Sequence, residues 1–105
     1  MALMVAKLSY EAIEALRPLV PRIKRHDRSL ADQLVRAASS VALNLAEGAG
    51  SDPGNRKARY FTALGSANEV RSTLQVANAV GLLPANPALD DRLDKIMATL
   101  WKLTR

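Results

Sequence analysis

Small and polar residues occupy the middle of this chain, at positions where a helical bundle usually carries leucine. Residues 36–50 read RAASSVALNLAEGAG, and Gly65, Ser66 and Glu69 follow in the next helical stretch. Such residues let two helix backbones approach closely while still offering hydrogen-bonding groups. The pattern therefore favours helices packed tightly around a few fixed polar side chains.

The composition favours a single helical domain. The chain has 105 residues, with 18 Ala and 16 Leu, and it contains no cysteine. Alanine and leucine are strong helix formers, and a chain of this length builds one hydrophobic core. The missing cysteines exclude disulfides and thiolate metal sites.

The first residues do not have the pattern of a signal peptide. Lys7, Glu11 and Glu14 interrupt the apolar run at the N-terminus. Because no stretch approaches the ~18 apolar residues that a membrane span requires, we expect no membrane partner and a soluble, cytoplasmic protein.

The spacing of apolar residues predicts four helices, at about 3–25, 28–47, 54–80 and 87–103. Pro18 and Pro21 fall within the first of them, where each removes a backbone donor, so we expect a kink or a break there. Short connections between the helices require neighbours to run antiparallel. The sequence thus predicts an all-α, up-down-up-down four-helix bundle spanning residues 1–105.

Residues at the helix ends set these boundaries. The second helix is expected to begin near Asp27 or Ser29, and to end at Gly48 in the left-handed conformation. Asp52 with Pro53 and Asn86 with Pro87 are typical helix starts, and Gly81 marks the end of the third helix.

A row of polar side chains runs along the second and third helices. We expect its members to form a structural polar network: Arg36, Ser40, Asn44, Glu47, Ser66 and Glu69. One interpretation is a buried, fully hydrogen-bonded network that fixes helix register and assembly. The alternative is that these groups line a site that touches a substrate or nucleic acid.

The sequence offers little support for catalysis. Glu47 and Glu69 would have to face each other across the bundle to act as an acid–base pair or as metal ligands. Bundles that bind two metal ions use Glu-x-x-His pairs, whereas His26 is the only histidine here. We therefore expect a protein that is not an enzyme, with no catalytic residue, no metal and no cofactor.

Basic residues are concentrated in two segments. Residues 17–36 carry a net charge of +4 and residues 52–71 a net charge of +2, within a total of +5. Such segments are typical of polyanion-binding surfaces, although they also occur as ordinary solvated faces. The candidate nucleic-acid contacts are Arg22, Lys24, Arg25, Arg28, Arg56, Lys57 and Arg59.

The polar row carries a family resemblance. The run DQLVRAASSV at residues 32–41, the run NLAEG at residues 44–48, and Gly65, Ser66 and Glu69 resemble the 23S rRNA intervening-sequence protein family, small bacterial four-helix-bundle proteins. The resemblance covers nearly the whole chain. It implies a closed four-helix bundle that assembles into a ring-shaped homopentamer.

The same resemblance extends to the accessory variability proteins of diversity-generating retroelements. Those proteins share the pentameric bundle, bind nucleic acid through basic surfaces and partner a reverse transcriptase. Two differences thin the basic surface here: Val35 stands where a second arginine is frequent, and residues 51–54 precede Arg56.

Two functions follow as expectations. The first is a non-enzymatic homo-oligomer, a pentamer by resemblance, that binds RNA or DNA, with RNA favoured, through basic surfaces as an accessory or scaffold factor. The alternative is an interaction module that docks a protein such as a reverse transcriptase. An exposed apolar patch involving Trp101, Met97 or residues 82–83 would favour the alternative.

Overall fold

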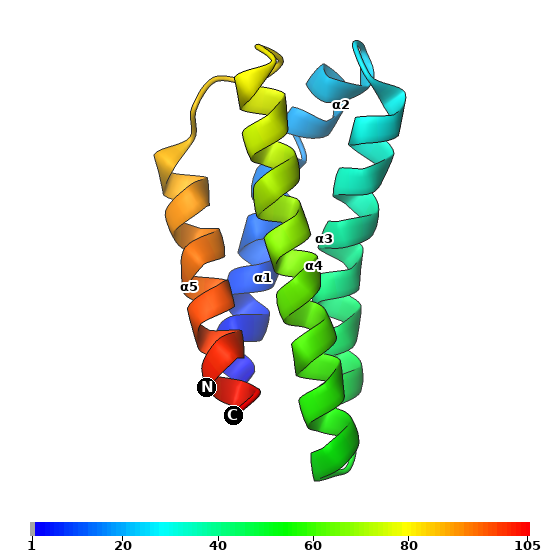
Figure 1. Cartoon of the computed structure of the whole chain (residues 1–105), viewed down its shortest axis with the longest axis vertical. Coiled ribbons are helices and arrows are strands. Elements are labelled where there is room, and N and C mark those ends of the chain that lie inside the picture. The colour runs from blue at the N-terminus through cyan, green and yellow to red at the C-terminus, as the bar shows by residue number, and fades with distance from the viewer. Residues whose placement is uncertain (1) are drawn as a thin grey trace.

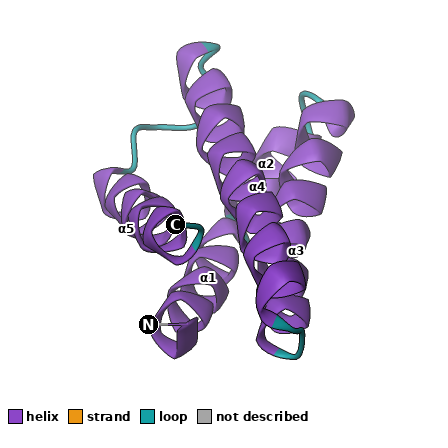
Figure 2. Cartoon of the chain, turned by 60° about the horizontal axis from the view of Figure 1, so that its bottom comes forward, coloured by secondary structure: helices purple, strands orange, loops and turns teal. Residues whose placement is uncertain are grey.

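Four long helices and one short helix form an elongated bundle (Figure 1). The computed structural model describes residues 2–105, and its principal extents are 42 × 23 × 18 Å. The helices are α1 (Ala2–Leu16), α2 (Leu19–Lys24), α3 (Arg28–Ala49), α4 (Pro53–Ala79) and α5 (Pro87–Leu103). The long helices alternate in direction along the chain, and α1 packs between α3 and α5 (Figure 2).

The first expected helix is interrupted at its prolines. Helix α1 ends at Leu16, and α2 begins at Leu19 after Pro18, which has no N–H to continue the hydrogen-bond ladder. Although α2 has only six residues, it is anchored by Ile23, whose side chain is completely buried. The break turns α2 across one end of the bundle and leaves its basic side chains exposed.

The prediction that Gly48 ends the second helix in a left-handed conformation is wrong. Helix α3 continues to Ala49, and Gly48 is buried within it. A Cβ atom at Gly48 would lie 2.6 Å from Cε1 of Tyr60, whose own side chain is 3 % exposed. Glycine is therefore needed at this position for close approach between α3 and α4, and not for its backbone freedom.

Gly81, by contrast, has the expected role. Its φ of +82° is in the left-handed region, directly after α4. The N–H of Leu82 donates to the carbonyl of Ala77 at 2.8 Å, and the N–H of Gly81 donates to the carbonyl of Asn78 at 3.0 Å. These two bonds satisfy carbonyl groups that the helix end would otherwise leave without partners.

Side chains cap the start of three helices. Asp27 accepts the N–H of Leu30 at 2.9 Å, so the cap of α3 is Asp27 and not Ser29. Asp52 caps α4 and Asn86 caps α5 in the same way, each followed by proline. Such caps stabilise a helix by roughly 1 kcal/mol each.

The core between the helices is aliphatic. Its most completely buried large side chains are Val5, Ile23, Leu34, Val70, Ile96 and Leu100. Removing a side chain of this size from water contributes about 1.5–3 kcal/mol. Alanines from α3 and α4 fill the spaces between them, which keeps these two helices close together.

Candidate nucleic-acid interface

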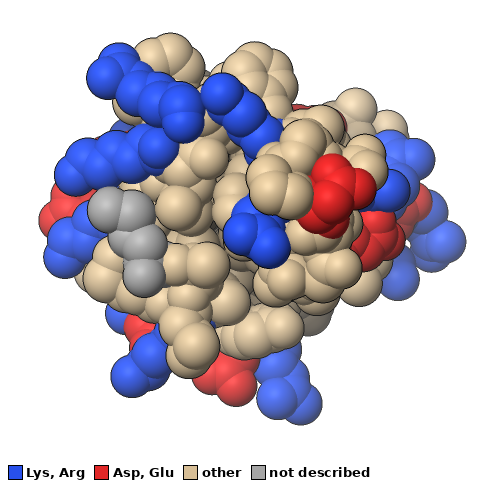
Figure 3. All heavy atoms as spheres, turned by 90° about the horizontal axis from the view of Figure 1, so that it is seen from below, with Lys and Arg blue, Asp and Glu red and all other residues tan. Residues whose placement is uncertain are grey.

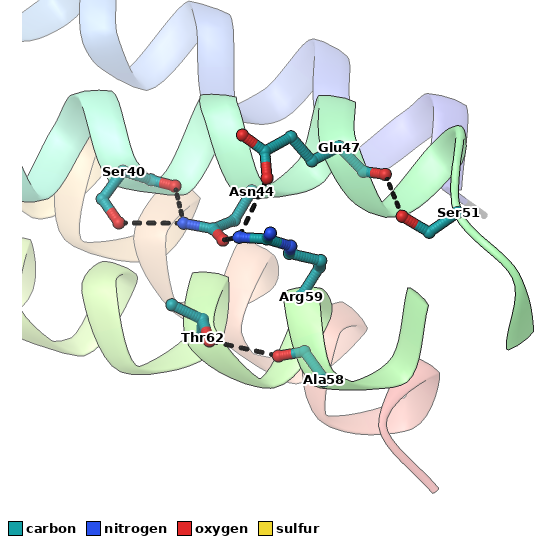
Figure 4. Close-up of polar contacts among 7 residues, drawn as sticks. All are labelled: Ser40, Asn44, Glu47, Ser51, Ala58, Arg59 and Thr62. Carbon is teal, nitrogen blue, oxygen red and sulfur yellow. Dashed lines mark hydrogen bonds and ion pairs between the residues drawn. The ribbon is translucent and has the colours of Figure 1, made fainter. Parts of the chain in front are cut away.

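Part of the predicted polar network joins α3 to α4. The hydroxyl groups of Ser40 and Ser66 are hydrogen-bonded at 2.7 Å. The side-chain amide of Asn44 donates to the carbonyl oxygen of Ser40 at 2.8 Å and to its hydroxyl at 3.1 Å (Figure 4). All three side chains are half-buried. This cluster fixes the register of the two helices about the middle of α3.

An arginine extends the cluster towards the end of α3. Nη1 of Arg59 lies 2.9 Å from the Glu47 carboxylate, and the same atom is 3.5 Å from the Asn44 side-chain oxygen (Figure 4). Both members of the ion pair are about half exposed. Solvent screens such a pair, so its contribution to stability is only about 0–1 kcal/mol.

Two members of the predicted network lie apart from it. Arg36 and Glu69 are exposed, and neither makes an ion pair or side-chain hydrogen bond with another residue of the network. Both lie one helical turn from a serine of the cluster, Arg36 from Ser40 and Glu69 from Ser66, but their side chains extend into solvent. The expectation of one buried network is therefore wrong: the cluster is partly exposed and contains four of the six residues, together with Arg59.

The two carboxylates considered for catalysis are far apart. Glu47 lies opposite Arg59, whereas Glu69 is ten residues further along α4, a distance of about 15 Å at 1.5 Å per residue. Within residues 2–105, no three His, Asp or Glu side chains gather in a way that could hold a metal ion. The arrangement that would make these two carboxylates an acid–base pair is thus absent.

The connection between α3 and α4 uses a second arginine. Nε of Arg56 donates to the carbonyl of Gly48 at 3.3 Å, and its Nη2 donates to the carbonyl of Ser51 at 3.1 Å. Asp52 caps α4 here, and its pKa lies below the usual aspartate value, mainly because the carboxylate accepts the backbone N–H of Asn55 and then its side-chain N–H. Two of the seven candidate contacts, Arg56 and Arg59, thus serve the α3–α4 hairpin.

The first four candidate contacts form a separate basic cluster at the opposite end of the bundle. Arg22, Lys24 and Arg25 project from α2 and the residue after it, and Arg28 begins α3. All four are exposed, and none forms an ion pair with a carboxylate of the part of the chain that the structure describes. We call these four residues the α2 cluster.

The α2 cluster concentrates positive charge with little compensation. The nearest carboxylate in sequence, Asp27, is used to cap α3. Arg28 lies in the first turn of α3, where the helix dipole already disfavours a positive side chain. An anion bound here would relieve both sources of repulsion.

Lys57, the remaining one of the seven candidate contacts, lies at the other end of the molecule, together with two cations that the sequence did not identify as contacts, Lys102 and Arg105. Arg71 pairs with Asp90 at 3.3 Å and with Asp94 at 3.2 Å, which sets the antiparallel register of α4 and α5. By that register the last turn of α5 lies level with residues 60–63 of α4, so Arg105 lies near the level of Lys57, whereas Trp101 is about 7.5 Å away from that level along the axis. Seen from this end, basic side chains stand around much of the outline of the molecule, with acidic side chains between them (Figure 3).

A tryptophan belongs to the same region. Trp101 is 50 % exposed, and Cζ of Arg105 lies 4.9 Å from the centroid of its ring. We call Lys57, Trp101, Lys102 and Arg105 the Trp101 patch. The signal that would have identified it is the absence of any acidic residue after Asp94.

An apolar groove follows the contact between α1 and α3. Its upper part has a volume of about 400 Å³ and is lined by Ile13, Leu16, Val20, Val35, Ala38 and Ser39 among others. A second hollow, nearer the N-terminus, lies between Leu3 and Tyr10 of α1 and the alanines of α3. We call this surface the α1/α3 groove. It exists because α3 presents alanines to α1, where larger side chains would fill the space.

Most of the residues expected to form an apolar patch are not exposed. Leu83 is buried, and Leu82 and Met97 are half-buried against the core. Of the predicted set only Trp101 reaches the surface. The larger apolar surface is the α1/α3 groove, which sequence reasoning did not identify. In residues 2–105 there is no helix with the length and apolar character needed to span a membrane.

Comparisons with known proteins agree with this architecture. A crystal structure of a protein of unknown function from the S23 ribosomal protein family of Bacteroides thetaiotaomicron superposes with a TM-score of 0.87, covering 96 % of this chain and 98 % of that one. The two are 16 % identical, so the likeness concerns the fold alone. Curated protein sequences give no match. The model of the family described as 23S rRNA-intervening sequence protein matches residues 2–102, and the chain therefore belongs to this family.

Proposed function

We propose that this protein is a non-enzymatic, oligomeric nucleic-acid-binding protein that acts as an accessory or scaffold factor, with RNA as its favoured ligand. The observation that carries the proposal is the α2 cluster: four exposed cations at one end of the bundle, without ion-pair partners among the described carboxylates. Membership of a family described by an rRNA intervening sequence supports RNA as the ligand.

The chemistry of the α2 cluster suits phosphate groups. Arginine presents a planar fork of N–H donors that binds two phosphate oxygens at once, and lysine adds a mobile point charge. Contacts of this kind are indifferent to base sequence and weaken steeply with salt. Arg56 and Arg59 are less suited to this role, because they already hold the α3–α4 hairpin together.

Oligomerisation is the second part of the proposal. We infer a ring-shaped homopentamer, for which the family resemblance gives the subunit number and the α1/α3 groove offers an apolar surface for subunit contact. Several copies of the α2 cluster on one assembly would raise the effective concentration of each for a long polyanion. Weak single contacts would then add up to useful affinity.

Charge reversal at the α2 cluster tests the proposal. We expect Arg22→Glu/Arg25→Glu to weaken binding of a labelled RNA and of a duplex DNA by tenfold or more at low salt. The matched control, Lys7→Glu/Lys95→Glu, changes the net charge equally at exposed positions elsewhere on α1 and α5. Fluorescence anisotropy measures affinity, and light scattering measures the mass of each variant.

The outcomes separate three cases. A selective loss in the α2 variant supports the proposal, whereas equal losses in both variants mean diffuse attraction to a basic protein. If the unmodified protein binds neither probe at low salt, the proposal fails.

The remaining candidate is an interaction module that docks a protein such as a reverse transcriptase. The α1/α3 groove favours it, because an apolar groove with exposed Leu3, Tyr10 and Val35 beside it is suited to an amphipathic helix of a partner. A Val35→Arg substitution that abolishes capture of a purified reverse transcriptase, without changing the mass of the oligomer, would support this function.

A further inference from the structure

The Trp101 patch differs from the α2 cluster in having an aromatic ring at its surface. Trp101 is the only tryptophan of the chain and half of its surface is exposed, although indole rings are usually well buried. Only about half of the indole surface is therefore removed from water. Trp101 is in the last turn of α5, and the exposed part of its ring faces solvent there.

Arg105 fixes the character of this ring. Its Cζ atom lies 4.9 Å from the ring centroid, a cation–π contact between the last turn of α5 and the residue after its C-cap. The guanidinium lies over part of the ring, and the remaining exposed surface of the indole is open to a ligand. The indole and the guanidinium together are the two kinds of group on which unpaired bases stack.

The surroundings of the ring are positive. Lys102 is adjacent to Trp101 in sequence, and the register of α4 and α5 brings Lys57 near the level of Arg105, about 7.5 Å beyond Trp101 along the axis. Lys57, Lys102 and Arg105 form no ion pairs with the carboxylates of residues 2–105. An exposed apolar ring surrounded by unpaired cations suits a ligand that has both flat apolar faces and negative charges.

We propose that the Trp101 patch binds an unpaired nucleotide segment, with one base stacked on Trp101 and the flanking phosphates on Lys57, Lys102 and Arg105. The inference rests on the proposed nucleic-acid function and specifies a single-stranded ligand. A duplex hides the faces of its bases within the stack, so the ring of Trp101 at the protein surface can stack only on unpaired bases. The α2 cluster, which has no exposed aromatic ring among its four residues, binds single and double strands alike.

The single tryptophan makes the test direct. Titration of the unmodified protein with a short oligouridine should quench the intrinsic fluorescence of Trp101, because stacking brings a base against the indole. An abasic oligonucleotide with the same number of phosphates should bind without comparable quenching. Equal quenching by both probes, or binding of oligouridine with no change in fluorescence, would overturn the inference.

Substitution provides the second readout. Trp101→Leu should weaken binding of labelled oligouridine about tenfold, the usual effect of losing one stacked base, and leave duplex DNA binding unchanged. Leu43→Ala is the control, since Leu43 is an exposed apolar residue of α3 outside the Trp101 patch. Circular dichroism establishes that both variants are folded.

The result also distinguishes this inference from the proposed function. If Trp101→Leu binds oligouridine as the unmodified protein does, while Arg22→Glu/Arg25→Glu does not bind, the Trp101 patch has no such role and the α2 cluster keeps its own. If neither nucleic acid binds, both proposals fail. Fluorescence that changes on dilution of the protein alone would mean that a second subunit covers Trp101, which also overturns the inference.

Discussion

At the scale of single residues, glycine has a different structural role at Gly48 of α3 and at Gly65 of α4. Gly48 is enclosed, because the ring of Tyr60 occupies the space that a side chain would need. Gly65 lies on the exposed side of α4, and a Cβ atom built there meets no other atom within 4 Å. In the sequence both are simply glycines in a run of small residues. Their roles become distinct only in the structure, where Gly48 is buried and Gly65 is exposed.

Alanine at these two positions should therefore have opposite effects. We expect Gly48→Ala to lower the free energy of unfolding by about 1–3 kcal/mol, because the buried Tyr60 ring has to move. Gly65→Ala should raise it by about 0.5–1 kcal/mol, because alanine is the better helix former and nothing in the chain obstructs it. Urea denaturation at one fixed protein concentration measures both changes.

The two variants act as controls for each other, since both add the same methyl group to a helix. A destabilised Gly65→Ala variant would contradict this account. If that variant also had a lower mass by light scattering, the cause would be a contact between subunits on the outer side of α4.

The hydroxyl pair between α3 and α4 can be measured in the same way. Ser40→Ala and Ser66→Ala should each cost about 1 kcal/mol, because each removes the hydrogen bond between the two half-buried hydroxyl groups. The double variant should cost less than the sum, since the two substitutions remove one shared bond. Additive losses in a double-mutant cycle would show that the bond contributes nothing.

At the scale of elements, the starts of helices and the break at the prolines were easier to predict than the contacts between helices. Proline after Asp52 and Asn86 identified the starts of α4 and α5 directly, because the sequence signal and the physical cause are both local. The end of α3 depends on Tyr60, which is twelve residues away, so Gly48 was misinterpreted. The same limitation applies to the polar row, because helical spacing aligns Arg36 and Glu69 with the cluster but does not show that their side chains are exposed and unbonded to it.

The Asp52 cap gives stability a dependence on pH. The pKa of Asp52 is lowered in the folded protein, so the carboxylate stabilises α4 fully above the unfolded value of about 4 and loses this effect as the pH falls through the folded value. Asp52→Ala should lower the thermal midpoint by a few degrees at neutral pH, and the difference from the unmodified protein should shrink in acid. Thermal melts followed by circular dichroism across this range measure the gap.

Asp52→Asn is the suitable control for this effect, because asparagine also caps helices but does not titrate. It should retain most of the neutral-pH stability and show a weaker acid dependence. If the difference in thermal midpoint between Asp52→Ala and the unmodified protein grew in acid, the Asp52 carboxylate would not be the group that stabilises α4.

At the scale of the whole molecule, two groups of basic side chains lie at opposite ends of the long axis. The α2 cluster lies at one end of a bundle 42 Å long, and the Trp101 patch lies at the other. The sequence indicated the amount of positive charge but not this division, because residues 22–28 and residues 56–59 look alike as basic segments. Only the internal hydrogen bonds of Arg56 and Arg59 distinguish the second segment from the first.

The division makes a prediction about salt. With four cations of the α2 cluster on a duplex, the logarithm of the affinity should fall with the logarithm of the salt concentration with a slope of about −3 to −4 per subunit in contact. Each cation removed from the α2 cluster should reduce the slope by about 0.9. Anisotropy titrations at several salt concentrations give these slopes, and a slope that is unaffected by Arg22→Ala would exclude this residue as a phosphate contact.

The alternating helix directions have a practical consequence for attachment. Both ends of the described chain emerge at the same pole as the Trp101 patch, opposite α2 (Figure 1). A tether fused to either end would hold the protein with the α2 cluster facing outward and would crowd Trp101 against the support. Immobilised protein should thus capture duplex freely, whereas unpaired strands would have little access to Trp101. The choice of attachment therefore decides which end of the molecule an experiment tests.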